Sequence, residues 1–461
     1  MPNTHRTRPL LSFLIIAALL LLLTPIALRA MAGWPLMPGA QSYVALRHAT
    51  TIFDGTAGID PVTGIAFAPT LYDVTLALFM ALGIDWLLPA LLAACALTLA
   101  YTLFRRALPP IDAFAATAAI ALSPAFIVAG TRHESSIAAL SLCALTFLWV
   151  RKPLLSTLAL CAALITSLPL GIITGILLLT ISIRDKQMMT MFGVIGAFLI
   201  AGAWTVGWHG GVQAFPALKM PSSDVLFEFG ASNGLSAFFI ILAAYGSTKS
   251  ARSLPYSFTL TIAIIIAILF PSTRLAASIV VAVLASRGVL RLVREGWELD
   301  PLRQLFIVLV WCAAGFLIVT LVRSVSLEQP SDRLVEVLSY IGEQRRSGGV
   351  LTDPALAPMV TYFSGRHATL PDDASQTVVR AALFTRDTNA LYTLLESTDT
   401  SFVLITREMR NGFFTRSDEG ILFLLPNTER FVTITSDQDV TLWYYINRQP
   451  RLEPSNITTA S

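Results

Sequence analysis

The sequence predicts a polytopic α-helical membrane protein that carries one α/β domain at its C-terminus. Leu10–Leu28 is an almost uninterrupted apolar run, and comparable runs recur as far as Val322. About 20 apolar residues in a helix rise roughly 30 Å, the thickness of the hydrocarbon core of a bilayer. Charged residues make up 13% of the chain and the mean hydropathy is +0.68, whereas a soluble domain has about 25% charged residues. We therefore expect a transmembrane domain at 1–323 and a soluble domain at 324–461.

The first apolar run reads as a retained helix. It exceeds the roughly 7–15 residues of a signal-peptide core, and Ile26–Ala30 contains the charged Arg29 instead of a small-x-small cleavage site. The net charge of +3 is too small to indicate a nucleic-acid partner. All four cysteines lie in apolar segments, so disulfides are not expected to hold the soluble domain together.

Basic residues mark the gaps between apolar segments and predict the topology. They are Arg105-Arg106, Arg151-Lys152, Arg184 with Lys186, Lys249 with Arg252, and Arg287, Arg291 and Arg294. Short loops rich in Lys and Arg stay in the cytoplasm, and the N-terminus has basic residues of its own. Two crossings between successive clusters give eleven spans with the C-terminal domain outside: 10–28, 86–104, 110–129, 135–150, 154–168, 170–183, 188–208, 233–247, 255–270, 275–290 and 303–322.

This count depends on two segments. Leu154–Ile183 is split near Pro169, because a single helix would place the flanking basic clusters on opposite sides. Leu71–Leu82 is too short to cross and is expected to lie as a helix at the outer face. External chemistry must then come from the soluble domain and four segments: 31–70 (the first external loop), 130–135, 210–233 and 271–274.

The spacing of the apolar residues changes from Asp332 onward. We expect helices at 334–343, 357–365, 374–384 and 389–396, strands at 350–352 and 402–406, and a late hairpin from 431–435 and 440–445. Alternating strands and helices suggest a layered α/β domain with a parallel core. The domain contains no Gly-rich phosphate fingerprint, nucleophile elbow or metal-spaced Cys/His set, so a rigid capping domain is the simplest interpretation.

Four stretches carry a resemblance to a known family. They are Gln41–Ala49, which contains Tyr43 and Arg47; Ala129–Ala138, which contains His133 and Glu134; Asp224–Glu228; and Pro271–Leu275, which contains Arg274. With these four stretches in this order along the sequence, the chain resembles the C-type glycosyltransferase (GT-C) fold. Within that fold it is most similar to the catalytic subunit of asparagine-linked oligosaccharyltransferases of the archaeal type. Val350–Arg366 aligns with the start of that family's soluble domain.

The resemblance implies transfer of a sugar or oligosaccharide from a polyprenyl-phosphate-linked donor to an acceptor at the outer membrane face, as in protein glycosylation. It implies a multi-pass protein of the cell membrane whose partners are the lipid-linked donor, membrane lipids and an acceptor, proteins included, that the sequence does not identify. The implied cofactor is a divalent metal, Mg²⁺ or Mn²⁺. The implied site residues are Gln41, Glu134 and Glu228 for catalysis, Arg274, Tyr43 and Arg47 for substrate binding, and His133 and Glu134 for the metal.

The chain departs from the family pattern at three places. Gln41 stands where the family has a metal-binding Asp, and His133-Glu134 stands where it has an Asp-x-Asp/Glu pair. Asp353–Ala357 occupies the place of the Trp-Trp-Asp-Tyr-Gly acceptor motif, without Trp or Tyr. A Gln carbonyl, a His and one Glu would hold a metal more weakly than a set of carboxylates, and acceptors other than Asn-x-Ser/Thr remain open.

Three other interpretations stay in view. His133 and Glu134 could form a solvated turn, and Arg274 could reach toward lipid headgroups without binding a substrate. The chain could then be a catalytically silent relative that binds lipid-linked glycan or scaffolds partners. A transporter is the third interpretation, and uptake by proteoliposomes would test it. Transporters usually have ionisable residues at mid-membrane, and these spans have almost none away from their ends.

Overall fold

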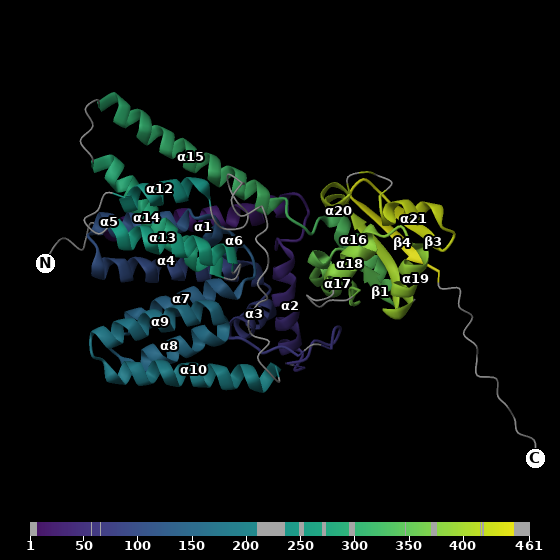
Figure 1. The fold of residues 1–461 in the computed structure, drawn as a ribbon, viewed down its shortest axis with the longest axis horizontal. Helices are drawn as coiled ribbons and strands as arrows, with labels where there is room; N and C mark the ends of the chain where they lie inside the picture. Colours follow the sequence, from purple (N-terminus) through teal and green to yellow (C-terminus); the bar gives the residue numbers. More distant parts are fainter. Residues whose placement is uncertain are drawn as a thin grey trace, which may run out of the picture. The chain divides into compact units, whose positions relative to one another are not determined.

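The protein folds into two compact units, Met1–Gln329 and Pro330–Ser461. In the computed structural model the described residues are 7–56, 58–64, 66–209, 236–248, 253–269, 273–294, 300–345, 347–369, 376–414, 416 and 419–446. Figure 1 shows long helices in the first unit and a small sheet with short helices in the second. The predicted Glu228 and its loop lie outside the described residues.

The first unit has a helix at each of the predicted spans and two further helices, one within the first external loop and one directly after it. These are α1 (Thr7–Met31), α2 (Ala40–Phe53), α3 (Leu71–Ala81), α4 (Leu88–Ala107) after a short 3-10 turn (Asp85–Leu87), α5 (Pro110–Ala121), α6 (Pro124–Thr131), α7 (Ser135–Leu148), α8 (Pro153–Thr166), α9 (Leu168–Arg184), α10 (Met188–His209), α12 (Ala237–Thr248), α13 (Ser253–Leu269), α14 (Arg274–Arg294) and α15 (Asp300–Ser326).

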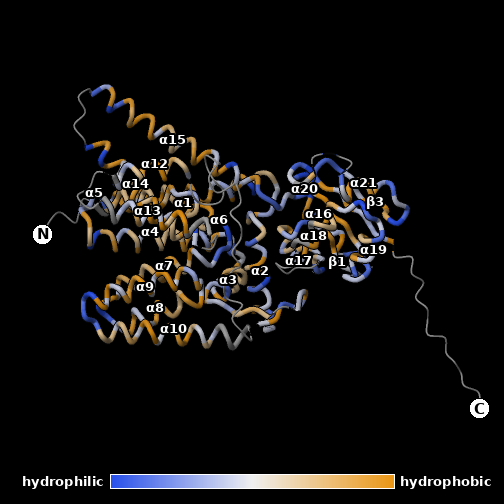
Figure 2. Tube along the Cα trace, in the orientation of Figure 1, coloured by the Kyte–Doolittle hydropathy of each residue, from blue (hydrophilic) through white to orange (hydrophobic). Residues whose placement is uncertain are grey.

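This is a multi-pass membrane protein. Within the described ranges, four helices are long and apolar enough to cross a bilayer: Pro9–Met31, Asp85–Ala107, Arg274–Arg294 and Asp300–Ser326. The bent pair α5 and α6 adds a fifth if it counts as one span, and most of the other predicted spans are apolar helices of 10–17 residues. Figure 2 shows the hydrophobic residues along the helices and the hydrophilic ones at their turns.

Prolines set two breaks in the first unit. The segment predicted as one span at 110–129 is two helices that meet at 61°, because Pro124 begins α6 directly after Ser123. The predicted split near Pro169 is confirmed, since α8 ends at Thr166 and α9 begins at Leu168. Gly171 packs so tightly there that a Cβ on it would lie 2.6 Å from Cα of Leu164.

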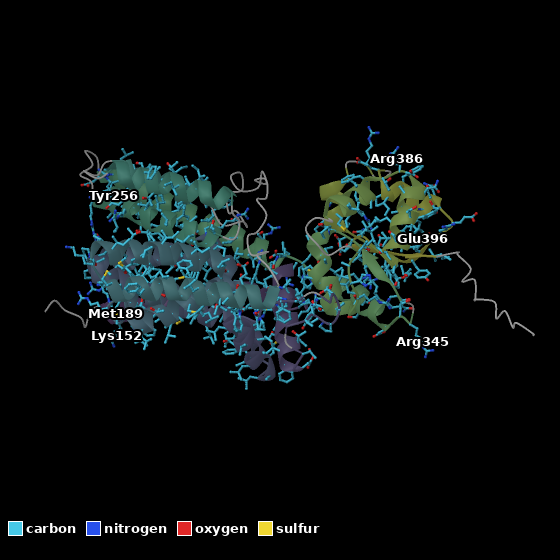
Figure 3. The ribbon with its side chains drawn as sticks, turned by 60° about the horizontal axis from the view of Figure 1, so that its bottom comes forward. Lys152, Met189, Tyr256, Arg345, Arg386 and Glu396 are labelled. Atoms are coloured by element: carbon cyan, nitrogen blue, oxygen red, sulfur yellow. The ribbon has the colours of Figure 1, made fainter. Side chains whose placement is uncertain are left out.

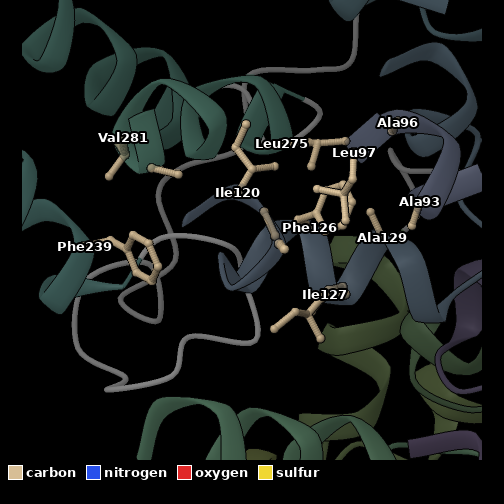
Figure 4. Close-up of a cluster of buried hydrophobic side chains, with 14 of the residues drawn as sticks. Ala93, Ala96, Leu97, Ile120, Phe126, Ile127, Ala129, Phe239, Leu275 and Val281 are labelled. Carbon is tan, nitrogen blue, oxygen red and sulfur yellow. The ribbon is translucent and has the colours of Figure 1, made fainter. Parts of the chain in front are cut away.

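Small residues let the helices of the first unit approach closely. Ala93 and Ala96 are almost completely buried in one core cluster, together with the larger side chains of Phe126 and Ile127 (Figure 4). Glycines bring α12 and α14 into backbone contact. A Cβ on Gly246 would lie 2.3 Å from the carbonyl oxygen of Leu284, and one on Gly288 would lie 2.2 Å from that of Leu242. Close packing of small residues is a main source of helix association in lipid, where burial of apolar surface gives little.

Helices α2 and α3 lie across one end of the long helices of the first unit (Figure 1). The predicted helix at 71–82 is confirmed as α3, and Thr70 starts it with a capping box. The Thr70 side chain accepts from the Asp73 backbone N–H, and the Asp73 carboxylate accepts from the Thr70 backbone N–H. This cap fixes the first turn of α3, which contributes to the site described below.

The second unit contains a four-stranded sheet of order β1-β2-β4-β3. Its elements are α16 (Asp332–Glu343), β1 (Gly349–Leu351), a 3-10 turn (Pro354–Leu356), α17 (Ala357–Ser364), α18 (Gln376–Phe384), α19 (Thr388–Ser397), β2 (Thr400–Thr406), α20 (Arg407–Phe413), α21 (Ile421–Asn427), β3 (Phe431–Ser436) and β4 (Val440–Tyr445). The expected parallel core is wrong, because only β1 and β2 pair in parallel. The second strand of the late hairpin, β4, pairs antiparallel with both β2 and β3 and makes the sheet mixed.

The Arg366 side chain connects the end of α16 with the start of β1. Its guanidinium donates to the carbonyl oxygens of Ile341, Gln344 and Gly348 at 2.7–3.1 Å, and its Cζ lies 5.2 Å from the ring centroid of Phe402. Gln344 follows α16 and Gly348 precedes β1, so one side chain satisfies carbonyl groups on both sides of this connection.

Candidate functional site

A cavity of about 850 Å³ lies at the end of the first unit where α2 and α3 cross the long helices. Five segments that are far apart in the sequence meet there: α2, the loop that leads into α3, the turn between α6 and α7, the break between α8 and α9, and the start of α14. Its polar and aromatic lining residues are Gln41, His48, Phe67, Thr70, Tyr72, Asp73, Arg132, His133, Glu134, Ser135, Ser136, Ser167 and Arg274.

Four of the residues singled out from the sequence line this one cavity: Gln41, His133, Glu134 and Arg274. Tyr43 and Arg47 are not in the lining. The buried Tyr43 hydroxyl donates to the carbonyl oxygen of Met37 at 3.0 Å, and the Arg47 guanidinium forms an ion pair with Asp60. The structure thus brings four of the seven predicted site residues together and engages Tyr43 and Arg47 in contacts within the first external loop, while Glu228 lies outside the described residues.

Side-chain contacts attach α2 to the turn that carries His133. The Ser42 hydroxyl donates to the carbonyl oxygen of Pro38 at 2.7 Å and accepts from the backbone N–H of His133 at 3.1 Å. Gly39, with φ of 81°, precedes α2, and a Cβ there would lie 3.0 Å from Nε of Arg132. A positive φ and this close approach both favour glycine. These contacts hold Gln41, at the start of α2, beside His133 and Glu134.

His133 is buried between a tyrosine and a carboxylate. The Tyr72 hydroxyl lies 3.0 Å from Nδ1 of His133, and Oδ2 of Asp85 lies 3.8 Å from Nε2. Burial lowers the pKa of His133 below its usual value, and the nearby Asp85 opposes that shift. Burial also raises the pKa of Tyr72. The lowered pKa favours the neutral imidazole, whose Nδ1 accepts a hydrogen bond from the Tyr72 hydroxyl when Nε2 carries the ring proton.

The two carboxylates that line the cavity, among the described residues, differ in their hydrogen-bond partners. Oδ2 of Asp73 accepts from both the backbone N–H and the hydroxyl of Thr70, at 2.9 and 2.7 Å, and so completes the cap of α3. The Glu134 carboxylate accepts from the Ser136 hydroxyl at 3.2 Å and lies 3.9 Å from Nη1 of Arg132. The Glu134 carboxylate therefore accepts fewer and longer hydrogen bonds from the protein than the Asp73 carboxylate.

Arg132 connects the cavity to the end of α15. Its Nη2 lies 2.6 Å from Oε2 of Glu328, and the backbone carbonyl oxygen of Glu328 accepts from the Arg29 guanidinium. Burial raises the pKa of Glu328, although the charge of Arg132 opposes this shift. The same contacts hold the turn between α6 and α7 against the chain that leaves the last long helix of this unit.

Arg274 is the first residue of α14. The N-terminus of a helix has unsatisfied backbone N–H groups and the positive end of the helix dipole, so it favours an anion. Arg274 adds a planar guanidinium, which can donate two parallel hydrogen bonds to a phosphate. Together with Arg132, this gives the lining of the cavity two cationic side chains.

The described residues do not fit the expected Mg²⁺ or Mn²⁺ site. Across the described ranges, no group of three or more His, Cys, Asp or Glu side chains is placed to hold a metal ion. Nδ1 of His133 faces the Tyr72 hydroxyl, and the Asp73 carboxylate caps α3. Mg²⁺ prefers near-octahedral oxygen ligands, whereas the expected pair, His133 and Glu134, supplies one imidazole and one carboxylate.

Sequence reasoning missed Tyr72, Asp73 and Arg132 as lining residues. A signal for the first two was present, since Thr70-Leu71-Tyr72-Asp73 has the spacing of a capping box and fixes the start of α3. The pairing of Tyr72 with His133 joins residues 61 positions apart. It depends on how the first external loop folds back, for which the sequence offers no comparable signal.

The whole-chain fold matches solved membrane glycosyltransferases, although no protein-family model and no curated protein matches the sequence. Archaeal oligosaccharyltransferase AglB from Archaeoglobus fulgidus, in complex with an inhibitory peptide and a dolichol-phosphate, aligns at a TM-score of 0.57 and 12% identity over 96% of this chain and 75% of that one. The Archaeoglobus fulgidus enzyme in complex with Zn and sulfate gives 0.54 and 14%, over 86% and 68%.

A second kind of structure aligns over nearly the whole of both chains. ArnT from Cupriavidus metallidurans bound to undecaprenyl phosphate has a TM-score of 0.56 and 11% identity, over 95% of this chain and 99% of that chain. These identities establish the fold and leave donor and acceptor to be inferred from the site. The protein has the GT-C fold shared by these oligosaccharyltransferase and ArnT structures.

Proposed function

We propose that this protein is a membrane glycosyltransferase that transfers a sugar or oligosaccharide from a polyprenyl-phosphate-linked donor to an acceptor at the outer membrane face. One observation carries the proposal: Gln41, His133, Glu134 and Arg274, from three distant parts of the chain, line a single cavity. The GT-C fold supports it, as do the dolichol-phosphate and undecaprenyl phosphate in the complexes of two structural neighbours.

The donor phosphate would bind at the start of α14. Arg274 and the N-terminal N–H groups of that helix provide charge-assisted hydrogen bonds to a phosphate oxygen. The polyprenyl chain would leave the cavity toward the lipid, because the rest of α14 is apolar enough to cross a membrane. The sugar would then face the polar side chains of α2 and the α6–α7 turn.

Transfer requires an acceptor hydroxyl or amine to attack the anomeric carbon. A new bond forms there while the bond from that carbon to the phosphate oxygen breaks, and polyprenyl phosphate leaves with the electron pair. Glu134 takes the acceptor proton, and Arg274 stabilises the charge on the departing phosphate. Gln41 would orient the sugar through its amide, and Glu228 stays a second candidate for the base.

Replacement of Arg274 tests the donor site. Arg274→Ala is expected to weaken binding of undecaprenyl phosphate by about 10- to 100-fold, because hydrogen bonds to charged groups contribute about 1.5–3 kcal/mol. Binding of the purified protein in nanodiscs to the labelled lipid measures this effect. The matched control is Arg323→Ala, an exposed arginine near the end of α15 that does not line the cavity. Equal losses in both variants, or no loss in either, would contradict the proposal.

The orientation can be checked by cysteine labelling in a background without the native cysteines. Asp54→Cys lies in the first external loop, and Lys186→Cys lies at the turn after α9; both positions are exposed. A membrane-impermeant maleimide is expected to label Asp54→Cys in intact cells and Lys186→Cys only after lysis. Labelling of both positions on the same side would exclude the predicted topology.

A catalytically silent protein that binds lipid-linked glycan is the second candidate. One observation favours it: among the residues that the structure describes, no three His, Cys, Asp or Glu side chains are grouped to bind a metal ion. Incubation with polyprenyl-phosphate sugars separates the two. Binding that depends on Arg274 without release of polyprenyl phosphate would support the silent protein, whereas release would support the transferase.

A further inference from the structure

Three arginines line a second cavity at the other end of α14. Arg287, Arg291 and Arg294 are spaced four and three residues apart, so they lie on one face of the helix. The cavity has a volume of about 380 Å³, and Asp112 and Leu290 complete its lining. None of these residues belongs to the cavity around Arg274.

Aromatic rings and a carboxylate from three other helices hold the guanidinium groups. Cζ of Arg287 lies 4.6 Å from the ring centroid of Tyr256 in α13, and Cζ of Arg291 lies 5.7 Å from that of Tyr245 in α12. Arg294 forms an ion pair with Asp112 at the start of α5. Cation–π contacts at these distances are attractive, and side chains that are already oriented lose less entropy when a ligand binds.

The charges that line this cavity suit an anion. Three guanidinium groups face one carboxylate, which leaves a net charge of +2 along the lining. Arg287 and Arg291 are half-buried, so they are less screened by solvent than surface charges. The planar donor forks of arginine match the oxygens of a phosphate.

The position of the cavity indicates the source of that phosphate. It lies at the C-terminal end of a helix that is apolar enough to cross a membrane, and Figure 3 shows Tyr256 at the same end of the bundle as Lys152 and Met189. Basic pockets between transmembrane helices at this depth recognise anionic lipid headgroups. We propose that Arg287, Arg291 and Arg294 bind the phosphate of an anionic glycerophospholipid in the leaflet opposite the Arg274 cavity.

Phosphatidylglycerol is a suitable probe, and native mass spectrometry of the full-length protein released from nanodiscs measures its binding. Arg287→Gln/Arg291→Gln is expected to lower phosphatidylglycerol affinity about 100-fold, since each substitution removes charge-assisted hydrogen bonds to the phosphate worth on the order of a factor of ten. Phosphatidylcholine binding should not change. The matched control, Arg184→Gln/Arg303→Gln, removes the same charge from two residues outside the cavity and should change the affinity less than about threefold at physiological salt, because charges away from the bound phosphate are screened.

Tyr256→Leu keeps all three charges and removes one ring, so it separates a built cavity from general charge. A loss of about two- to fivefold in affinity is expected, as for a cation–π contact. An equal loss in the control pair, or no preference for phosphatidylglycerol over phosphatidylcholine, would overturn the proposal. Displacement of the lipid by inorganic phosphate or by undecaprenyl phosphate would also overturn it, since either would assign the cavity to another anion.

Discussion

Glu134→Gln is expected to lower the rate of sugar transfer by about 100- to 10,000-fold, the usual effect of removing a general base. The carboxylates that line the cavity are Asp73 and Glu134, and Asp73 is occupied by the cap of α3. The glutamine keeps the size of the side chain and can still accept from Ser136, but it cannot take a proton. Release of polyprenyl phosphate from a polyprenyl-phosphate sugar measures the rate.

Two comparisons separate loss of the base from loss of the fold. Glu134→Gln should bind undecaprenyl phosphate within about twofold of the unchanged protein, because Arg274 and the N-terminus of α14 are intact. Glu134→Asp should recover part of the rate, since it restores a carboxylate at a greater distance. Full activity in Glu134→Gln would instead assign the base to another group, with Glu228 as the first to test.

Gly288→Leu is expected to have the largest effect on folding. A single Cβ at this position would lie 2.2 Å from the carbonyl oxygen of Leu242, and α12 cannot move away without also losing the contact at Gly246. Overpacking of a close interface costs about 1–3 kcal/mol, and more when the obstacle is backbone. Size-exclusion chromatography after heating should show a lower midpoint for this variant, and Gly288→Ala should lie between it and the unchanged protein.

Gly315→Ala in α15 is the matched control, since a Cβ there meets nothing within 4 Å. It should leave the midpoint unchanged or raise it slightly, because alanine is a better helix former than glycine by about 1 kcal/mol. A Gly288→Leu protein as heat-resistant as Gly315→Ala would show that α12 and α14 do not depend on this contact.

The sequence predicted the helices of the first unit well because their apolar runs are long and their ends are marked. Pro169 and the following glycine signalled the break between α8 and α9, and the basic clusters separated most of the other spans. The bend at Pro124 was missed because an apolar run does not reveal a change of direction. The parallel core was wrong because strand pairing in the second unit depends on where β4 inserts, and its alternating pattern fits either neighbour.

The site was predictable only in part. The order of the loops placed Gln41, Glu134 and Arg274 at one end of the bundle, and all three line the cavity. The contacts that decide their chemistry are tertiary. The Tyr72–His133 pair and the Arg132–Glu328 ion pair each join residues from different elements, and the second spans 196 positions. No local spacing encodes such pairs.

Helix α14 has the length of a membrane span. Its 21 residues separate Arg274 from Arg294 by about 30 Å, close to the thickness of the hydrocarbon core. If both ends of α14 bind phosphates, the length of the helix determines the height of the reactive sugar above the membrane midplane. Bilayers thicker or thinner than this length would force a choice between the two anchors, so catalytic rate should vary with acyl-chain length and peak where both are satisfied.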